Sequence, residues 1–437
     1  ELQELGLLEK IEDHQLAVGH CERCKTVIEP YLSDQWFVKM KPLAEKAIEA
    51  VKNGKLRFTP NRWVGVYLHW MENIRDWCIS RQLWWGHRIP AYTCGSCRHV
   101  MVAADCPDKC DKCGAAQGIT QDEDVLDTWF SSWLWPFSTM GWPEQTETLR
   151  RFYPTDTLVT GPDIIFFWVA RMVMAGYYFV GECPFHDVYF TSIVRDMKGR
   201  KMSKSLGNSP DPLEIIGKYG ADALRYTVIS LAPVGQDIRF AENKVEIGRN
   251  FANKLWNASR FVMMNLEGVS CSIKAGLPDA SRLSPIDNWI VSRMNYAIDQ
   301  VSANLAEGQF RFNDALKVAY EFIWNDFCDW YIEMCKPVLF GKDAERKALT
   351  LQVLVSCLDG ALRILHPFMP FVTEEIWQKL PGSEGFLMQA AFPVADAARV
   401  NVPLEQEVGE LMEAVRVIRN LRASANISPA KKITVRV

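Results

Sequence analysis

Residues 157–163 read TLVTGPD and are followed by the apolar run IIFFWVARMVMAGYYFV at 164–180. After GECPFH at 181–186, residues 187–194 read DVYFTSIV. Residues 157–160 and 187–194 have strand-like patterns, and residues 163–180 have the length and composition of a buried helix. Two strands joined by one helix predict a βαβ unit with parallel strands. The apolar run is also about as long as a membrane span, but Arg171 near its centre favours a core helix.

A basic loop follows the second strand. It reads Lys201-Met202-Ser203-Lys204-Ser205, after a tight turn at Lys198-Gly199. Two lysines three residues apart can hold a polyphosphate as point charges, and small neighbours let the backbone approach it. A solvated basic turn is the alternative interpretation. The position beyond the carboxyl end of a parallel strand favours the phosphate site, because open α/β sheets bind ligands there.

The composition indicates a globular chain of several domains. Its 437 residues are 48% hydrophobic and 23% charged, which excludes a disordered tail protein and a small disulfide-stabilised scaffold. The formal charge of -4 means that a nucleic-acid partner requires a local basic cluster. Such a cluster stands near the end of the chain and consists of Arg416, Arg419, Arg422, Lys431 and Lys432. The first residues lack the pattern of a leader peptide, so we expect a cytoplasmic protein without a membrane partner.

Two Cys-x-x-Cys pairs predict a metal site. Cys94, Cys97, Cys110 and Cys113 have the spacing of a tetrahedral structural zinc site; two pairs of buried thiols are the alternative. Cys106 fits this spacing less well and is expected to be a bystander. Cys21 and Cys24 form half of a similar site with no obvious second half nearby.

The flanking segments predict mainly helices. Upstream we expect a helix at the start of the chain, amphipathic helices over 42–53 and 62–73, and a short strand over 75–79. Asp211 and Pro212 predict the cap and first position of a helix. From residue 243 onward, helical spacing predicts an all-helical domain with helices over 289–305, 315–339, 348–365 and 373–380. A further helix over 405–422 leads into a strand at 433–435.

Several motifs together resemble the class I aminoacyl-tRNA synthetases. Lys201 to Ser205 matches the nucleotide-binding signature of that family letter for letter. Segments 76–90, 124–132 and 163–172 are similar to the valyl members; Leu-Trp-Trp-Gly follows Arg81-Gln82, where isoleucyl relatives usually have Arg-Tyr-Trp-Gly. The resemblance covers nearly the whole chain.

The resemblance implies a fold class and a domain order. The fold would be an α/β half of a Rossmann-type nucleotide-binding fold with a zinc-knuckle insertion, followed by an all-α helical bundle and a truncated α+β tail. Residues 1–40 would be the exit from an inserted editing domain. Residues 41–240 would be the second half of the catalytic domain, with the zinc knuckle at 90–118 and the signature loop at 198–208. Residues 241–400 would be the anticodon-binding domain, and residues 401–437 the start of a C-terminal domain.

The resemblance also implies the chemistry. In the family, the valine carboxylate attacks the α-phosphate of ATP, pyrophosphate leaves, and the adenylate is passed to the terminal ribose of tRNA(Val), with Mg²⁺ helping. Lys201 and Lys204 would neutralise the charge that develops. ATP and the adenylate would contact Gly161, Asp163, Ile193, Val194, Met202, Ser203 and Lys204. For Asp163, a helix N-cap is the alternative interpretation.

Two further sets of residues are carried over from the family. Trp129, Ile164 and Trp168 would line the L-valine pocket, with Ile164 and Trp168 on one helix face at i, i+4; core packing is the alternative. The tRNA-binding set would be Arg249, Lys254, Asn257, Arg260 and Phe261, because a ring can stack on a base while a guanidinium takes a phosphate. A solvated helix face is the alternative for each of them.

The chain departs from the family in one major respect. The other signature, His-x-Gly-His, does not occur in it. We therefore expect a fragment of an enzyme that is monomeric at full length, inactive by itself because half of the ATP site is missing. Three alternatives stay open: a non-catalytic tRNA-binding module, one half of a split synthetase, and an isoleucyl relative.

Overall fold

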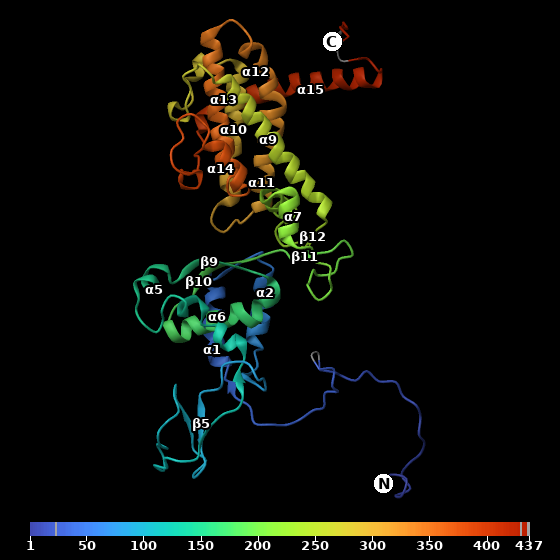
Figure 1. Cartoon of the computed structure of the whole chain (residues 1–437), viewed down its shortest axis with the longest axis vertical. Helices are drawn as coiled ribbons and strands as arrows, with labels where there is room; N and C mark the ends of the chain where they lie inside the picture. The colour runs from blue at the N-terminus through green and yellow to red at the C-terminus, as the bar shows by residue number, and fades with distance from the viewer. Residues whose placement is uncertain (22–23, 429–430, 435–437) are drawn as a thin grey trace. The chain divides into compact units, whose positions relative to one another are not determined.

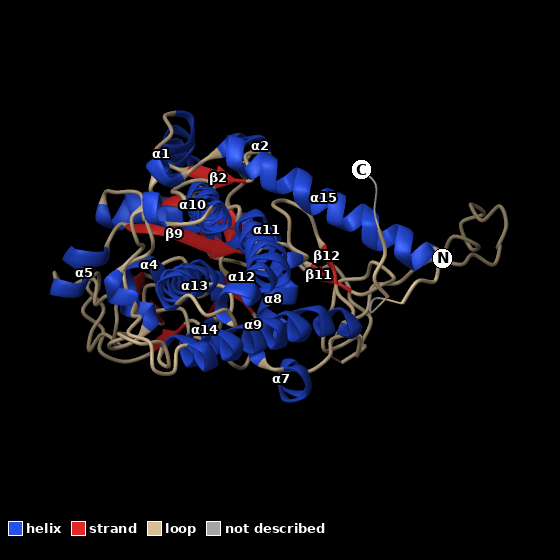
Figure 2. Cartoon of the chain, turned by 90° about the horizontal axis from the view of Figure 1, so that it is seen from above, coloured by secondary structure: helices blue, strands red, loops and turns tan. Residues whose placement is uncertain are grey.

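The computed structural model describes residues 1–21, 24–428 and 431–434. The chain divides into two compact units, which are described separately below. The first comprises residues 1–45 and 74–134, and the second residues 46–73 and 135–437. Helix α1 (Lys41–Lys52), predicted over 42–53, is shared between them along the chain. Figure 1 follows the elements in chain order, and Figure 2 separates helices from strands by colour.

The first unit contains three small antiparallel sheets. They pair β1 (Phe37–Val38) with β3 (Trp77–Cys78), β4 (Ser80–Arg81) with β8 (Val125–Leu126), and β5 (Ala91–Cys94) with both β6 (Val100–Val102) and β7 (Ile119–Gln121). The strand predicted over 75–79 is shorter, and a second strand begins after Ile79. Asp127 caps α3 (Thr128–Ser132), and its carboxylate accepts the Trp77 indole N–H at 3.0 Å.

The helix predicted at the start of the chain is wrong. Residues 2–6 form a turn that ends at Gly6, whose φ is +68°. Leu2, Leu5 and Leu7 are 60–71% exposed. A helix this short is marginal in water unless it buries an apolar face, and these side chains bury little.

A three-stranded parallel sheet forms the α/β part of the second unit. Its strand order is β2 (Arg57–Thr59), β10 (Phe185–Phe190), β9 (Thr155–Thr160), and α2 (Trp63–Glu72) follows β2. The helical crossover from β9 to β10 confirms the βαβ prediction. However, β10 ends at Phe190 and does not reach Val194. Val194 instead begins β11 (Val194–Arg195), which pairs in parallel with β12 (Ile238–Arg239).

The crossover is a helical segment whose type changes along its length. It consists of a 3₁₀ turn, η1 (Pro162–Ile164), a π-helix, η2 (Ile165–Val169), an α-helix, α6 (Ala170–Ala175), and a second π-helix, η3 (Gly176–Val180). The segments 162–180 and 344–365 are long and apolar enough to cross a membrane, yet 50% and 72% of their apolar windows are buried inside the fold. This burial is typical of core helices.

The rest of the second unit is mostly helical (Figures 1 and 2). Short helices α4 (Trp135–Ser138) and α5 (Glu147–Phe152) precede β9. After β11, α7 (Pro212–Tyr219) begins as predicted, with the Asp211 carboxylate accepting the Leu213 N–H at 2.9 Å. Then follow α8 (Ala221–Ser230), α9 (Val245–Asn265), α10 (Pro285–Leu305), α11 (Phe312–Glu321), the π-helix η7 (Phe322–Tyr331), α12 (Ile332–Leu339), α13 (Ala344–Leu365), α14 (Pro370–Trp377) and α15 (Val402–Ser424). These elements confirm the predicted helices. The predicted last strand is not present at Ile433 and Thr434, and Val435 lies outside the described residues.

A buried polar cluster holds three bundle helices together. Ser284 and Asp287 form a capping box at the start of α10. The Asp287 carboxylate, on a residue 2% exposed, also accepts the Tyr331 hydroxyl at 2.7 Å and pairs with Arg346 of α13. A buried carboxylate is tolerated only when its oxygens are paired. The cluster therefore fixes α10, η7 and α13 at one point.

Replacing this carboxylate tests its contribution to stability. Asp287→Ala should lower the free energy of unfolding by about 3 kcal/mol, because it removes a cap and leaves a buried hydroxyl and a partly buried guanidinium without their acceptor. Urea unfolding followed by circular dichroism measures the change. Asp299→Ala, at an exposed position of the same helix, should cost less than about 0.5 kcal/mol. Equal losses in the two variants would contradict the role of the cluster.

Candidate functional site

Two segments far apart in the chain meet at the carboxyl end of the parallel sheet. Gly161 and Asp163 follow β9, and Ile193 follows β10. Because the parallel register places Thr160 opposite Phe190, both segments leave the sheet at the same edge. There the Nζ of Lys201 lies 2.6 Å from the Oδ2 of Asp163.

A close approach explains the glycine at 161. A Cβ at this position would lie 2.6 Å from the Oδ1 of Asp163 and 3.9 Å from the Cδ1 of Ile193. The N-cap interpretation of Asp163 is wrong, because Gly161 is the N-cap of η1 and Asp163 lies within its first turn. The Asp163 carboxylate contacts the Lys201 ammonium instead.

A cavity of about 380 Å³ lies beside this ion pair. Its lining includes Ile193, Val194, Lys201 and Met202, together with Ile215 and Phe240. Met202 packs against the buried cluster that contains Ile215, Ile238 and Phe240. The structure therefore brings four of the predicted nucleotide-site residues together around one cavity. Ser203 and Lys204 lie further along the loop, and Lys204 is exposed.

Polar residues that the sequence did not indicate hold this edge in place. The Asp237 carboxylate accepts the Ile193 N–H at 3.3 Å and the Arg195 Nε–H at 2.5 Å. The hydrogen bond from Arg195 lowers the pKa of Asp237. Asp196 and Asn208, at the two ends of the basic loop, are hydrogen-bonded to each other at 3.0 Å. Asp237 is 44 residues from Ile193, so no local pattern could reveal the contact.

The three predicted pocket residues belong to different units. Trp129 lies in α3 of the first unit, whereas Ile164 and Trp168 lie in the crossover of the second unit. All three are half-buried. Ile164 lies in a 3₁₀ turn and Trp168 in the π-helix that follows, so their spacing of four does not fall on a regular α-helix.

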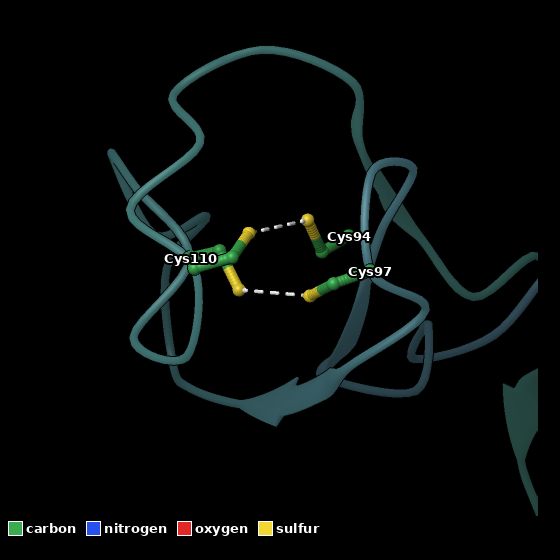
Figure 3. A group of neighbouring side chains, drawn as sticks. Cys94, Cys97 and Cys110 are labelled. Carbon is green, nitrogen blue, oxygen red and sulfur yellow. Dashed lines mark hydrogen bonds between the residues drawn. The ribbon is translucent and has the colours of Figure 1, made fainter.

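The four predicted thiols of the first unit are gathered into one cluster. The ligand atoms of Cys94, Cys97, Cys110 and Cys113 all lie within 4.8 Å of one another. The Sγ–Sγ distance is 3.7 Å for Cys94 and Cys113 and 3.6 Å for Cys97 and Cys110 (Figure 3). A hydrogen bond from the Cys97 backbone lowers the pKa of Cys94 to about 6. Cys106 is exposed, and its thiol contacts the Pro107 carbonyl, not the cluster.

The segment that carries the second cysteine pair is only partly described. The Lys25 N–H donates to the Cys21 carbonyl at 2.9 Å, and the Cys24 thiol donates to the Thr26 hydroxyl at 3.3 Å. This contact with Thr26 lowers the pKa of Cys24 to about 7. The two residues between the cysteines lie outside the described part of the chain. Among the described residues, the thiol cluster above is the one group of three or more ligands with metal-site geometry.

Helix α9 carries the predicted tRNA-binding residues on and beside a groove. Lys254, Asn257 and Phe261 line a groove of about 510 Å³, together with Asn250, Asn253 and Lys336, which were not predicted. Lys254 lies 2.5 Å from the Asp329 carboxylate and 3.7 Å from the centroid of the Trp324 ring. Arg249 and Arg260 are not among the groove residues: Arg249 lies 5.7 Å from the Tyr219 ring, and Arg260 is exposed. The asparagine spacing of three and four along α9 is the signal that could have identified this surface.

Two family models match the chain. The model described as tRNA synthetases class I (I, L, M and V) matches residues 11–241, and the model described as the anticodon-binding domain of tRNA ligase matches residues 287–437. The first match includes the sheet, the ion pair, the cavity and the thiol cluster. The second includes most of the helical bundle.

Curated relatives cover the whole chain. It is 53% identical over 435 residues to a valine--tRNA ligase of Thermotoga maritima and 52% identical over 440 residues to one of Petrotoga mobilis. Both alignments cover 100% of this chain and 49% of the relative. The chain thus spans about half the length of the curated relatives it matches.

Solved structures share the fold at low identity. A ternary complex of Agrobacterium radiobacter K84 LeuRS with tRNA and LeuAMS matches with a TM-score of 0.62 at 21% identity, over 77% of this chain and 46% of that one. A Mycobacterium tuberculosis methionyl-tRNA synthetase bound by methionyl-adenylate matches with a TM-score of 0.62 at 19% identity, over 88% and 69%. With the family model covering more than half of the residues, the chain belongs to the class I tRNA synthetases (I, L, M and V).

Proposed function

We propose that the chain forms the part of a valine--tRNA ligase that holds the signature-loop half of the ATP site and the anticodon-binding domain. In this proposal the parallel sheet is half of a Rossmann-type fold, with a zinc knuckle inserted before β9. One observation carries the proposal: the Lys201–Asp163 ion pair stands beside a cavity lined by Ile193, Val194 and Met202, at the carboxyl edge of parallel strands. This is where open α/β sheets bind nucleotides.

The residues at the cavity have distinct parts in the proposed reaction. The adenine would lie against the Ile193 and Val194 backbone, and the Asp163 carboxylate would accept hydrogen bonds from the hydroxyls of the ribose. Lys201 and Lys204 would neutralise the triphosphate as the valine carboxylate attacks the α-phosphate and pyrophosphate leaves. Mg²⁺ would add positive charge at the same phosphates when bound. The half-buried Ile164 and Trp168 of the second unit would select valine by shape, which rejects larger side chains but not an isosteric threonine.

An exchange assay distinguishes this proposal from a chain that is active alone and from a non-catalytic binding module. ATP–pyrophosphate exchange with valine is measured with this chain alone and after addition of the amino-terminal half of the Thermotoga maritima relative. We expect exchange only in the mixture. Exchange by the chain alone would contradict the half-site argument, and tRNA binding without exchange in either sample would favour a binding module. Competition between valine and isoleucine in the active mixture tests the isoleucyl alternative.

The loop lysine Lys204 should affect turnover more than substrate binding. In the active mixture, Lys204→Ala should lower kcat for exchange by about 100-fold, because the positive charge acts mainly on the charge that develops in the transition state. The KM for valine should change little. Lys198→Ala, which removes an exposed charge from the tight turn before the signature, is the matched control. Comparable losses in both variants would show that only the general charge of the loop matters.

We propose that the thiol cluster binds structural Zn²⁺. Four thiolates bound to zinc at about 2.3 Å in a tetrahedron lie roughly 3.8 Å apart, and the two measured Sγ–Sγ distances are 3.7 and 3.6 Å. These two distances, in a cluster whose four donor atoms lie within 4.8 Å of one another, support zinc as the ligand. A site with four protein ligands has no open position, so the metal would hold β5 and its neighbouring loops together and take no part in the reaction.

Zinc content provides a direct test. The purified chain should contain about one equivalent of zinc, and Cys110→Ser should lose it, because three thiolates bind the metal much more weakly. Inductively coupled plasma mass spectrometry measures the content. Cys106→Ser, four residues away and outside the cluster, should keep its zinc. Retention of zinc by Cys110→Ser would contradict the four-thiolate site.

We also propose that the α9 groove and its surroundings bind tRNA(Val). Asn257 and Phe261 line the groove with Asn250 and Asn253, which gives amide groups for base edges beside a ring for stacking. Arg260 is exposed next to them and would contact a phosphate.

Salt dependence tests the phosphate contact. Arg260→Ala should weaken tRNA(Val) binding and reduce the slope of log K against log[salt] by about 1, because one fewer phosphate is neutralised. Filter binding between 50 and 200 mM salt measures the slope. Arg282→Ala, at an exposed arginine that pairs with Glu345, should leave the slope unchanged. An unchanged slope for Arg260→Ala would remove this residue from the interface.

A further inference from the structure

We propose that Asp196 and Asn208 form a clasp that positions Lys201 and Lys204 for the phosphates of the nucleotide. Both would be positioning residues, since neither lines the cavity and each acts through the loop that carries the lysines. The inference rests on the proposed function, because it takes ATP as the ligand of the cavity.

Asp196 organises the first half of the loop. Its Oδ1 accepts the Lys198 N–H at 3.0 Å and the Arg200 N–H at 2.9 Å. Its Oδ2 accepts the Arg200 guanidinium at 2.8 Å and the Asn208 Nδ2–H at 3.0 Å. With both oxygens occupied and Arg200 balancing its charge, this carboxylate shapes the loop without neutralising the lysines that follow.

Asn208 holds the second half of the loop at two points. Its Oδ1 accepts the Ser203 N–H at 3.0 Å, and its Nδ2 also lies 3.3 Å from the Lys201 carbonyl oxygen. The amide therefore grips the backbone on both sides of Met202, the residue whose side chain packs into the apolar cluster beneath the cavity. The fixed segment carries Lys201, whose ammonium lies 2.6 Å from the Asp163 carboxylate, and leads directly into Lys204.

The clasp closes the loop at its base. Asp196 and Asn208 are 12 residues apart in the chain. Met202 lies between them in the sequence, and its N–H donates to the Val194 carbonyl at 3.1 Å. The hydrogen bonds of Asn208 and of the Arg200 backbone keep the pKa of Asp196 well below its usual range. The carboxylate thus stays charged, and the clasp intact, at every pH above the ordinary range of aspartate.

The test compares two probes that share one nucleoside. ATP and adenosine are titrated by isothermal calorimetry into the mixture of the chain with the amino-terminal half of the Thermotoga maritima relative, because only ATP carries phosphates for the lysines. Asn208→Ala should weaken ATP binding by about tenfold and leave adenosine binding unchanged, since the lysines lose their direction while the adenine surface stays in place. Asn265→Ala, which removes an amide bound to a backbone carbonyl at 2.8 Å on α9, is the matched control and should change neither affinity.

A swapped pair separates positioning from general loss of structure. Asn208→Asp places two carboxylates together and should weaken ATP binding at least as much as Asn208→Ala. Adding Asp196→Asn restores an amide-to-carboxylate hydrogen bond with its direction reversed, but not the contacts with the Arg200 guanidinium and the Lys201 carbonyl, so it should recover part of the lost ATP affinity. Equal weakening of ATP and adenosine, or no recovery in the swapped pair, would overturn the positioning role.

The outcomes also separate this inference from the proposed function. If the unaltered chain binds ATP and Asn208→Ala binds it equally well, the clasp has no positioning role, while the nucleotide site stands. If the mixture that contains the unaltered chain binds neither ATP nor adenosine, the nucleotide site itself is wrong, and the positioning role is overturned with it.

Discussion

The parallel pairing of β9 with β10 is the constraint on which the candidate site depends. Residue 160 lies opposite residue 190, and the Thr191 N–H extends the ladder by donating to the Thr160 carbonyl at 2.9 Å. A helical crossover is needed to return the chain to the same end of the sheet. The two segments that follow the strands therefore leave side by side, and Asp163 meets Lys201 across 38 residues of sequence.

The sequence predicted the parts of the site whose geometry is local. The Cys-x-x-Cys pairs fold into knuckles by themselves, so their spacing was enough to place four thiols in one cluster. The signature loop was likewise visible as a short motif after a strand. The contacts of Asp163 with Lys201 and of Asp237 with Ile193 could not be predicted, because each depends on strand register between segments 38 and 44 residues apart.

The positions of the helices were predicted better than their type, α or π. Apolar spacing located α10 through α15 within a few residues, since burial of one face determines where a bundle helix runs. The crossover at 162–180 is apolar on most sides, so its spacing could not distinguish an α-helix from the π-helical segments that the structure contains. The end of β10 was missed for a related reason: Ile193 and Val194 are apolar because they border a cavity and a second short sheet, not because they continue the strand.

The loop and the bundle are mechanically connected through α8. The Asp222 carboxylate accepts the N–H groups of Phe371 and Val372 at the start of α14, at 3.2 and 2.6 Å. Arg225, one turn further on, donates to the carbonyls of Pro367 and Phe368 at 2.9 and 3.0 Å. Helix α8 follows the loop directly through α7, so a displacement of α14 relative to α8 would break four hydrogen bonds, two of them to a buried carboxylate. Because leaving such a group unpaired is costly, these hydrogen bonds hold α8, which follows the basic loop through α7, against the start of α14.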